Sequence, residues 1–180
     1  MANEAPAVDL RYPIGKPKRT SVLTPEERRI AIEQIAEAPG RLSIAVAGLT
    51  PAQLDTPYRE NGWTVRQLVH HLADSHMNAF VRFKLAMTEQ EPTIKPYEQD
   101  LWAGLPDSQL PIEISLSLLT ALHQRWVALL QSMKPADLAR TFRHPEMGVV
   151  TLDGNLGMYA WHGLHHVAHI TALRERMGWN

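Results

Sequence analysis

A long helix is predicted to begin within the stretch TVRQLVHHLADSHMN at residues 64–78. Thr64 offers a side-chain oxygen to the unpaired amides of the first turn, and Gln67, three residues later, can reach back to the amide of Thr64. This capping box predicts a helix that continues to about Glu89 and carries three histidines, His70, His71 and His76.

The same kind of start signal occurs nearer the N-terminus. Thr24 is a suitable N-cap, Pro25 fits the first helical position, and Glu27 completes a capping box. A helix is therefore expected from there to about Gly48, with a kink or break at Pro39-Gly40.

Two further helices are predicted in the second half of the chain. One covers the leucine-rich residues 112–133, and the other runs from about residues 151–155 to just before Gly178. A long, proline-rich loop is expected at residues 90–110, with room for one short helix, and a short hairpin at residues 142–150. Four long helices in one small chain predict an all-α fold, a four-helix bundle with a long connection after the second helix and little strand.

We expect residues 24–180 to form this single domain and residues 1–23 to form an extended N-terminal arm. The 180 residues are 44% hydrophobic and 21% charged, as in a soluble globular protein, and the net charge of −1 argues against a general nucleic-acid binder. The absence of cysteine excludes disulfides, iron–sulfur clusters, thiolate zinc sites and a cysteine nucleophile. The sequence shows neither a membrane-spanning apolar run nor the pattern of a signal peptide, so a cytoplasmic protein without membrane contact is expected.

Seven of the nine histidines lie in two short stretches, at residues 70–76 and 162–169. A helix rotates by about 100° per residue, which places the histidines of the fourth helix on one face together with apolar side chains. A bundle buries such a face. The histidines on it are His162, His165, His166 and His169.

The second helix shows a similar but less regular pattern. Its inward stripe includes His71, Ser75 and Asn78, with Asp74 at the edge, whereas His70 and His76 fall off the stripe. Arg82 also falls on the stripe, which an apolar interior does not explain.

His162 and His166 are spaced i, i+4, so their rings can reach one ion from adjacent turns. A third imidazole from a facing helix would complete a set of nitrogen ligands with an open position, which suits Zn, Ni, Fe or Co in a catalytic site. The alternative is that these are hydrogen-bonded core histidines. An unsatisfied buried polar group costs about 1–3 kcal/mol, and a shared metal would satisfy several of them together. The motifs of di-iron carboxylate bundles, zincin proteases and serine hydrolases are absent.

Three segments together resemble the YfiT branch of the DinB-like superfamily: RYPIG at residues 11–15, GWTVRQLVHHLADSHMN at residues 62–78 and YAWHGLHHVAHI at residues 159–170. The resemblance implies a four-helix bundle with one divalent metal per chain, nickel or zinc, and it assigns the ligands to His71, His162 and His166. It also implies a homodimer and either a metal-dependent hydrolase or a thiol S-transferase. The superfamily's common Arg-Gly-Gln after the last ligand is replaced here by Val167-Ala168-His169.

In either reaction the metal would activate the nucleophile, which is water in the hydrolase that we favour or a low-molecular-weight thiol such as bacillithiol, mycothiol or glutathione in the transferase. A general base must lie within hydrogen-bond reach of that nucleophile. Asp74, one turn from His71, is the catalytic candidate, and a role in orienting a ligand is its alternative. The pocket of a small-molecule substrate is expected to be lined by Asn78, Arg82, His165 and His169. A non-catalytic metal-binding bundle is the remaining alternative.

Overall fold

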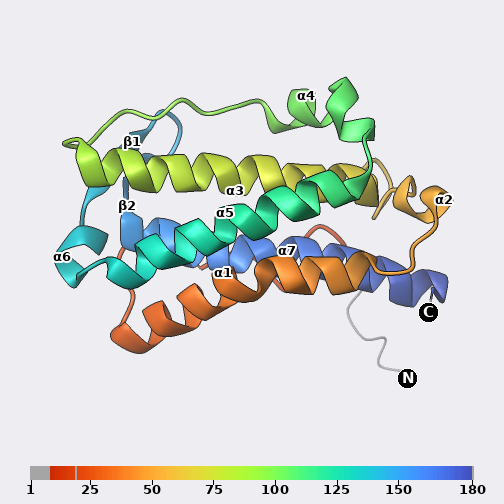
Figure 1. Cartoon of the computed structure of the whole chain (residues 1–180), viewed down its shortest axis with the longest axis horizontal. Helices are drawn as coiled ribbons and strands as arrows, with labels where there is room; N and C mark the ends of the chain where they lie inside the picture. The colour runs from red at the N-terminus through yellow and green to blue at the C-terminus, as the bar shows by residue number, and fades with distance from the viewer. Residues whose placement is uncertain (1–8, 19, 180) are drawn as a thin grey trace, which may run out of the picture.

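The computed structural model describes residues 9–18 and 20–179 and is mostly helical (Figure 1). Four long helices build the bundle: α1 (Pro25–Val46), α3 (Val65–Thr88), α5 (Ile112–Ser132) and α7 (Leu152–Met177). The connections hold the short helices α2 (Pro51–Leu54), α4 (Gln99–Ala103) and α6 (Pro135–Leu138), the 3₁₀ helix η1 (Pro106–Gln109), and an antiparallel hairpin of β1 (Thr141–His144) and β2 (Gly148–Thr151). The predicted fold class is confirmed. Within the described ranges, no helix has the length and apolarity needed to cross a bilayer.

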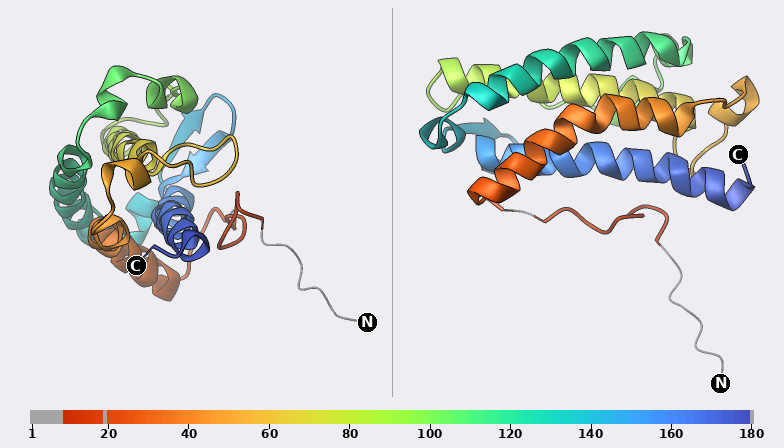
Figure 2. Two further views of the ribbon diagram at one scale, coloured as in Figure 1. Left: turned by 90° about the vertical axis from the view of Figure 1, so that its right-hand side faces the viewer. Right: turned by 60° about the horizontal axis from the view of Figure 1, so that its bottom comes forward.

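The four long helices form a ring in which α1 packs against α5 and α7, and α3 packs against the same two helices. Figures 1 and 2 show that α1 and α7 run in one direction and that α3 and α5 run in the other. Since α3 and α5 are parallel, the chain must return along the whole bundle between them. A helix of 21 residues is about 32 Å long, which explains why this connection, with α4 and η1 at its far end, is so long.

The helix starts follow the capping chemistry expected from the sequence. Thr24 and Thr64 each accept from the amide three residues later in a capping box, and the structure shows the same arrangement at Thr50, before α2. Pro39 does not break α1, which continues to Val46 and changes direction along its length (Figure 2).

Two apolar clusters fill the bundle, one toward each end. One surrounds Trp126 and Phe83, and the other surrounds Leu68 and Ile170. On each of the four long helices the two clusters are separated by a short interval, and most of the buried histidines of α3, α5 and α7 lie in or beside these intervals. The core therefore contains a polar layer between two apolar ones.

The expectation that His70 and His76 face away from the interior is wrong. Both side chains are buried, with exposed fractions of 7% and 1%. α3 is covered by α5 and α7 and also by α4 and η1 of the long connection, so that most of its circumference is interior.

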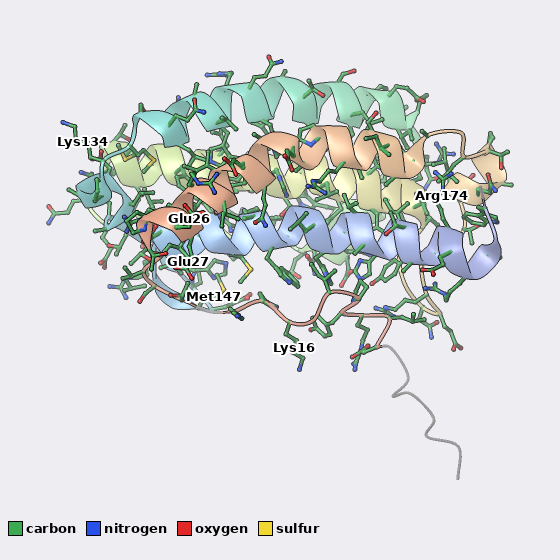
Figure 3. All side chains as sticks on the ribbon, turned by 90° about the horizontal axis from the view of Figure 1, so that it is seen from below. Lys16, Glu26, Glu27, Lys134, Met147 and Arg174 are labelled. Atoms are coloured by element: carbon green, nitrogen blue, oxygen red, sulfur yellow. The ribbon has the colours of Figure 1, made fainter. Side chains whose placement is uncertain are left out.

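The N-terminal segment runs beside α7, as the position of Lys16 shows in Figure 3. Its contacts include a hydrogen bond from the Trp161 indole to the Gly15 carbonyl, 3.3 Å, and one from the Thr151 hydroxyl to the Ser21 carbonyl, 2.6 Å. Residues 1–8 and 19 of the predicted arm lie outside the described residues, and the division into arm and bundle stays a prediction.

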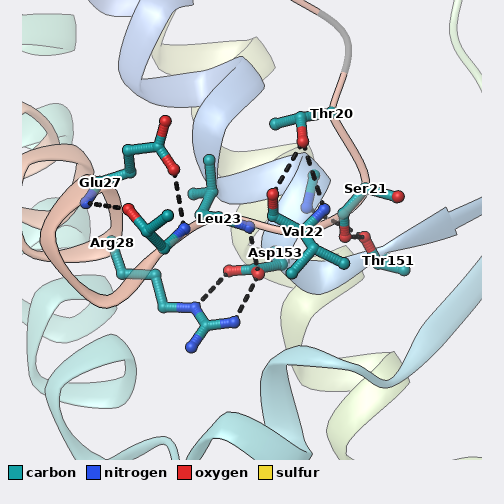
Figure 4. Close-up of polar contacts among 10 residues, drawn as sticks. Thr20, Ser21, Val22, Leu23, Glu27, Arg28, Thr151 and Asp153 are labelled. Carbon is teal, nitrogen blue, oxygen red and sulfur yellow. Dashed lines mark hydrogen bonds and ion pairs between the residues drawn. The ribbon is translucent and has the colours of Figure 1, made fainter.

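An ion pair between a partly exposed arginine and a buried carboxylate joins α1 to the start of α7. The carboxylate of Asp153, 2% exposed, accepts from both Nε and one terminal nitrogen of Arg28, at 2.8 and 2.7 Å, and from the amide of Leu23 at 2.7 Å (Figure 4). The paired carboxylate therefore satisfies donors from α1 and from the segment before it.

Asp153→Ala should lower the free energy of unfolding by about 2 kcal/mol, because it leaves the buried Leu23 amide without an acceptor and removes the partner of the partly exposed Arg28. Urea unfolding followed by circular dichroism measures this loss. Glu37→Ala is the control, since its pair with Arg41 is exposed and should be worth less than about 1 kcal/mol. An equal loss of unfolding free energy in the two variants would contradict the role of Asp153 as the acceptor for Arg28 and the Leu23 amide.

Candidate metal centre

Three histidines from two helices converge on one point of the bundle. His71 projects from α3, and His162 and His166 project from adjacent turns of α7. The Nε2 atom of His162 lies 3.4 Å from Nε2 of His71 and 3.2 Å from Nε2 of His166. One ring nitrogen from each of the three lies within 4.8 Å of the others. The structure thus brings together the three residues assigned as ligands, while their role as ligands stays a prediction.

These three imidazoles are neutral at physiological pH. Burial lowers the pKa of His71 to about 4. The pKa values of His162 and His166 lie well below the ordinary value, because both rings are buried and surrounded by other histidines. A neutral imidazole keeps a lone pair on one nitrogen, which is the form that binds a metal.

A cavity of about 470 Å³ opens beside the three nitrogens. Its walls are strongly aromatic: the Trp63 ring centre lies 4.5 Å from that of His71, Tyr58 stacks on His169 at 4.1 Å, and Trp161 stacks on His165 at 4.2 Å. The walls come from the N-terminal segment, the loop before α3, α4 and the facing sides of α3 and α7. They comprise Arg11, Tyr12, Tyr58, Arg59, Asn61, Gly62, Trp63, His71, Gln99, Asp100, Trp161, His162, His165, His166 and His169. A small molecule in this cavity could reach the nitrogen cluster directly.

His165 and His169 line the cavity, as expected from the sequence. Burial lowers the pKa of each to about 4. His166 faces His162 through Nε2 and faces His169 through Nδ1, which lies 3.4 Å from Nδ1 of His169. The other nitrogen of His169 lies 3.2 Å from the carbonyl oxygen of Arg11.

Two histidines that the sequence did not place at the site, His76 and His123, lie next to it. His76 Nε2 lies 3.2 Å from Nδ1 of His162, and His76 Nδ1 lies 2.8 Å from Nε2 of His123 on α5. One signal was available for His123, a single histidine in the middle of a leucine-rich helix. Its spatial partners, however, are 47 and 88 residues away, and no spacing rule connects them.

The remaining candidates on α3 lie elsewhere. Asp74 is partly buried, and burial together with the neighbouring charge of Asp107 raises its pKa to about 6. Asn78 donates to the Asp74 carbonyl, and Arg82 is buried with one nitrogen 3.5 Å from the Tyr159 hydroxyl. None of the three belongs to the described residues that line the cavity.

The expectation that Asn78 and Arg82 line the pocket is therefore corrected. They follow His71 by about two and three helical turns, or roughly 10 and 16 Å, which carries them beyond the cavity along the same face. The catalytic role of Asp74 stays a prediction, supported by its raised pKa and not by a place in the cavity wall.

Comparison with known proteins gives a consistent family relation. Residues 34–170 match the family model described as the DinB superfamily. A Bacillus mycoides (strain KBAB4) protein named "Putative metal-dependent hydrolase" is 57% identical over 171 residues, which cover 95% of this chain and 99% of that protein. A protein of the same description from Bacillus cereus (strain 03BB102) is 54% identical over the same shares.

Solved structures extend the relation to the fold. YfiT from Bacillus subtilis, described as "a probable metal-dependent hydrolase with an unusual four-helix bundle topology", superposes with a TM-score of 0.92 at 48% identity. The match covers 95% of this chain and 99% of YfiT. TT2238, described as a four-helix bundle protein, is 22% identical and superposes with a TM-score of 0.59. The match covers 81% of this chain and 98% of TT2238, and it supports the fold alone.

The metal-free protein should lose stability as the pH falls from 7.5 to 5. The pKa of His71 is about 4 in the folded protein and near 6.5 in the unfolded chain, so below pH 6.5 the unfolded chain binds the proton first. The contribution of neutral His71 to the free energy of unfolding is fully present above pH 6.5, and it is lost as the pH falls toward 4. At pH 5 this histidine alone accounts for about 2 kcal/mol. Urea unfolding in chelator measures the effect, and His71→Gln should show a weaker pH dependence. Equal stability at both pH values would contradict the neutral state of these rings.

Proposed function

This chain belongs to the DinB superfamily, and we propose that it is a divalent-metal-dependent enzyme, a hydrolase that acts on a small molecule. The observation that carries the proposal is the convergence of His71, His162 and His166 at the wall of an open cavity. The names of the relatives, including the 57% identical Bacillus mycoides protein, support the same reaction class.

The donor set suits a divalent transition metal. Three neutral imidazole nitrogens are ligands that Zn²⁺ and Ni²⁺ accept readily, and three protein ligands leave a position for an exchangeable one. A purely structural site closes its coordination with protein groups, whereas here the cavity adjoins the nitrogens. When bound, such an ion lowers the pKa of a water molecule toward 7 and so supplies a nucleophile at neutral pH.

The protein's own residues shape the environment of that chemistry. Trp63 covers His71 and limits the approach of bulk water from the side of the loop before α3. Arg59 contributes a positive charge to the cavity wall and is held over the Tyr58 ring at 5.3 Å. These features favour a small substrate that carries an anionic or strongly polar group.

The ligand assignment can be tested with a matched pair on one helix. Elemental analysis of the purified protein should find about one nickel or zinc ion per chain, and His71→Gln or His166→Gln should lose it. His70→Gln is the control, because His70 is adjacent in sequence and buried but contacts Ser115 and the Leu110 carbonyl instead. Full metal occupancy in His71→Gln, or equal loss in His70→Gln, would disprove the assignment.

The reaction class can be tested with the metal-loaded protein and a panel of small esters, amides and phosphoesters. We expect hydrolysis that does not depend on added thiol and that disappears in His166→Gln. An alkyl halide and an epoxide are added to the panel as electrophiles for a thiol. Their conversion to a thioether only in the presence of bacillithiol, mycothiol or glutathione, with release of halide or opening of the epoxide ring, would establish the S-transferase instead. The predicted homodimer can be checked on the same preparation by gel filtration.

Asp74→Asn examines the general base within the same assay. Since the carboxylate is outside the cavity wall, we expect kcat to fall less than about tenfold, below the 10²–10⁴-fold typical of a general base. A larger fall, with loss of an activity limb near pH 6, would identify Asp74 as that base.

A further inference from the structure

A row of hydrogen bonds crosses the bundle and uses one residue from each of its long helices. The carbonyl oxygen of Ile35 on α1 lies 2.6 Å from Nδ1 of His123 on α5. Nε2 of His123 lies 2.8 Å from Nδ1 of His76 on α3, and Nε2 of His76 lies 3.2 Å from Nδ1 of His162 on α7. We call the row from Ile35 to His162 the core relay.

The first acceptor of the core relay is available because of a proline. In a helix the carbonyl of residue 35 normally accepts from the amide of residue 39, and here residue 39 is Pro39, inside α1. Proline has no amide hydrogen, so the Ile35 carbonyl lacks its helical donor. A buried carbonyl needs a partner, and His123 supplies one.

This carbonyl determines where every proton of the core relay lies. A carbonyl only accepts, so His123 must carry its proton on Nδ1. A neutral His123 then accepts through Nε2, which places the proton of His76 on Nδ1. By the same step His76 accepts through Nε2, and His162 carries its proton on Nδ1. The Nε2 atom of His162 is left with a lone pair directed at the nitrogen cluster.

The surroundings favour this single arrangement. Both nitrogens of each ring already have a partner: His123 has the Ile35 carbonyl and His76, and His76 has His123 and His162. Trp126 packs edge-on against both rings, and Tyr159 packs edge-on against His76. With exposed fractions of 1% and 2%, the two histidines have no bulk water with which to exchange partners.

A second, shorter row reaches His166 from the N-terminal segment. The Arg11 carbonyl only accepts, so His169 carries its proton on Nε2 and accepts through Nδ1. His166 therefore donates from Nδ1 to His169, and its Nε2 atom also keeps a lone pair. We call this row the arm relay.

We propose that His76, His123 and His169 are positioning residues that hold His162 and His166 in the Nδ1–H tautomer, with both Nε2 lone pairs turned to the metal. The proposal rests on the function proposed above. Those two nitrogens lie 3.2 Å apart, and neither carries a proton to share, so the pair repels unless a cation binds between them. Metal-binding histidines commonly donate their other N–H to a fixed acceptor, and here that acceptor is itself a histidine.

The tautomers can be read directly by long-range ¹H–¹⁵N correlation spectra of the ¹⁵N-labelled, metal-free protein at pH 7.5. We expect the Nδ1–H form for His76, His123, His162 and His166, the opposite of what a free histidine favours in water, and the Nε2–H form for His169. Single His→Gln variants assign the signals. The Nε2–H form at His162 or at His123 would overturn the proposal.

Zinc affinity, measured by competition with a chelating dye, tests the consequence for the metal. His76→Leu removes the acceptor for His162 and should weaken zinc binding roughly 10- to 100-fold, with a mixture of His162 tautomers. His76→Gln keeps an acceptor oxygen near that place and should restore most of the affinity. His70→Gln, outside both relays, should bind zinc like the wild type.

The two proposals fail in different ways. Zinc binding by the wild type combined with unchanged affinity in His76→Leu would overturn the positioning role and leave the metal site intact. Absence of both zinc and nickel binding by the wild type would overturn the proposed function, and the tautomers would still report whether the relays exist. If His76→Leu does not fold, the wild-type spectra alone decide the positioning role.

Discussion

A neutral imidazole has two nitrogens and one proton, and the interior of this bundle must place that proton correctly for several buried rings in succession. The placement begins at two carbonyl oxygens, of Ile35 and Arg11, that can only accept. Each carbonyl fixes the donor nitrogen of the ring beside it, and each ring then fixes that of the next, until the row ends at His162 or His166. The hydrogen bonds that join all four long helices are therefore the same ones that, in our proposal, orient nitrogens for a metal.

Local signals in the sequence were sufficient for the elements of the fold. The threonine caps and the leucine-rich segment predicted the four long helices, and the prolines of residues 90–110 predicted the long connection. Helical periodicity also placed His162 and His166 on a buried face. It failed for His76, because periodicity separates a buried stripe from an exposed one, and α3 is covered on most of its circumference. The sequence predicts a kink or break at Pro39-Gly40, and it does not show the second consequence of Pro39, a carbonyl at Ile35 without a helical donor.

At the candidate site, too, the sequence identified the residues of single helices but not the contacts between distant segments. The resemblance to the superfamily named His71, His162 and His166, and the structure brings them together. The sequence departs from the family pattern at Val167-Ala168-His169, and that departure now has a structural account, since His169 links His166 to the Arg11 carbonyl. The cavity wall could not be derived from spacing, because it draws on the N-terminal segment, the loop at Tyr58–Trp63 and α4.

The relays also bear on how the chain folds. Their hydrogen bonds join residues separated by 88, 47 and 86 positions in the core relay, and by 158 positions between Arg11 and His169. Helices form early from local contacts, but pairings over such distances require large loops to close first, and loop closure is entropically costly. In a collapsed intermediate with all four helices formed, the lone pairs of His162 and His166 would thus have no defined direction. Full metal affinity would then appear only with the final packing, which would make the ion a reporter of the completed native state.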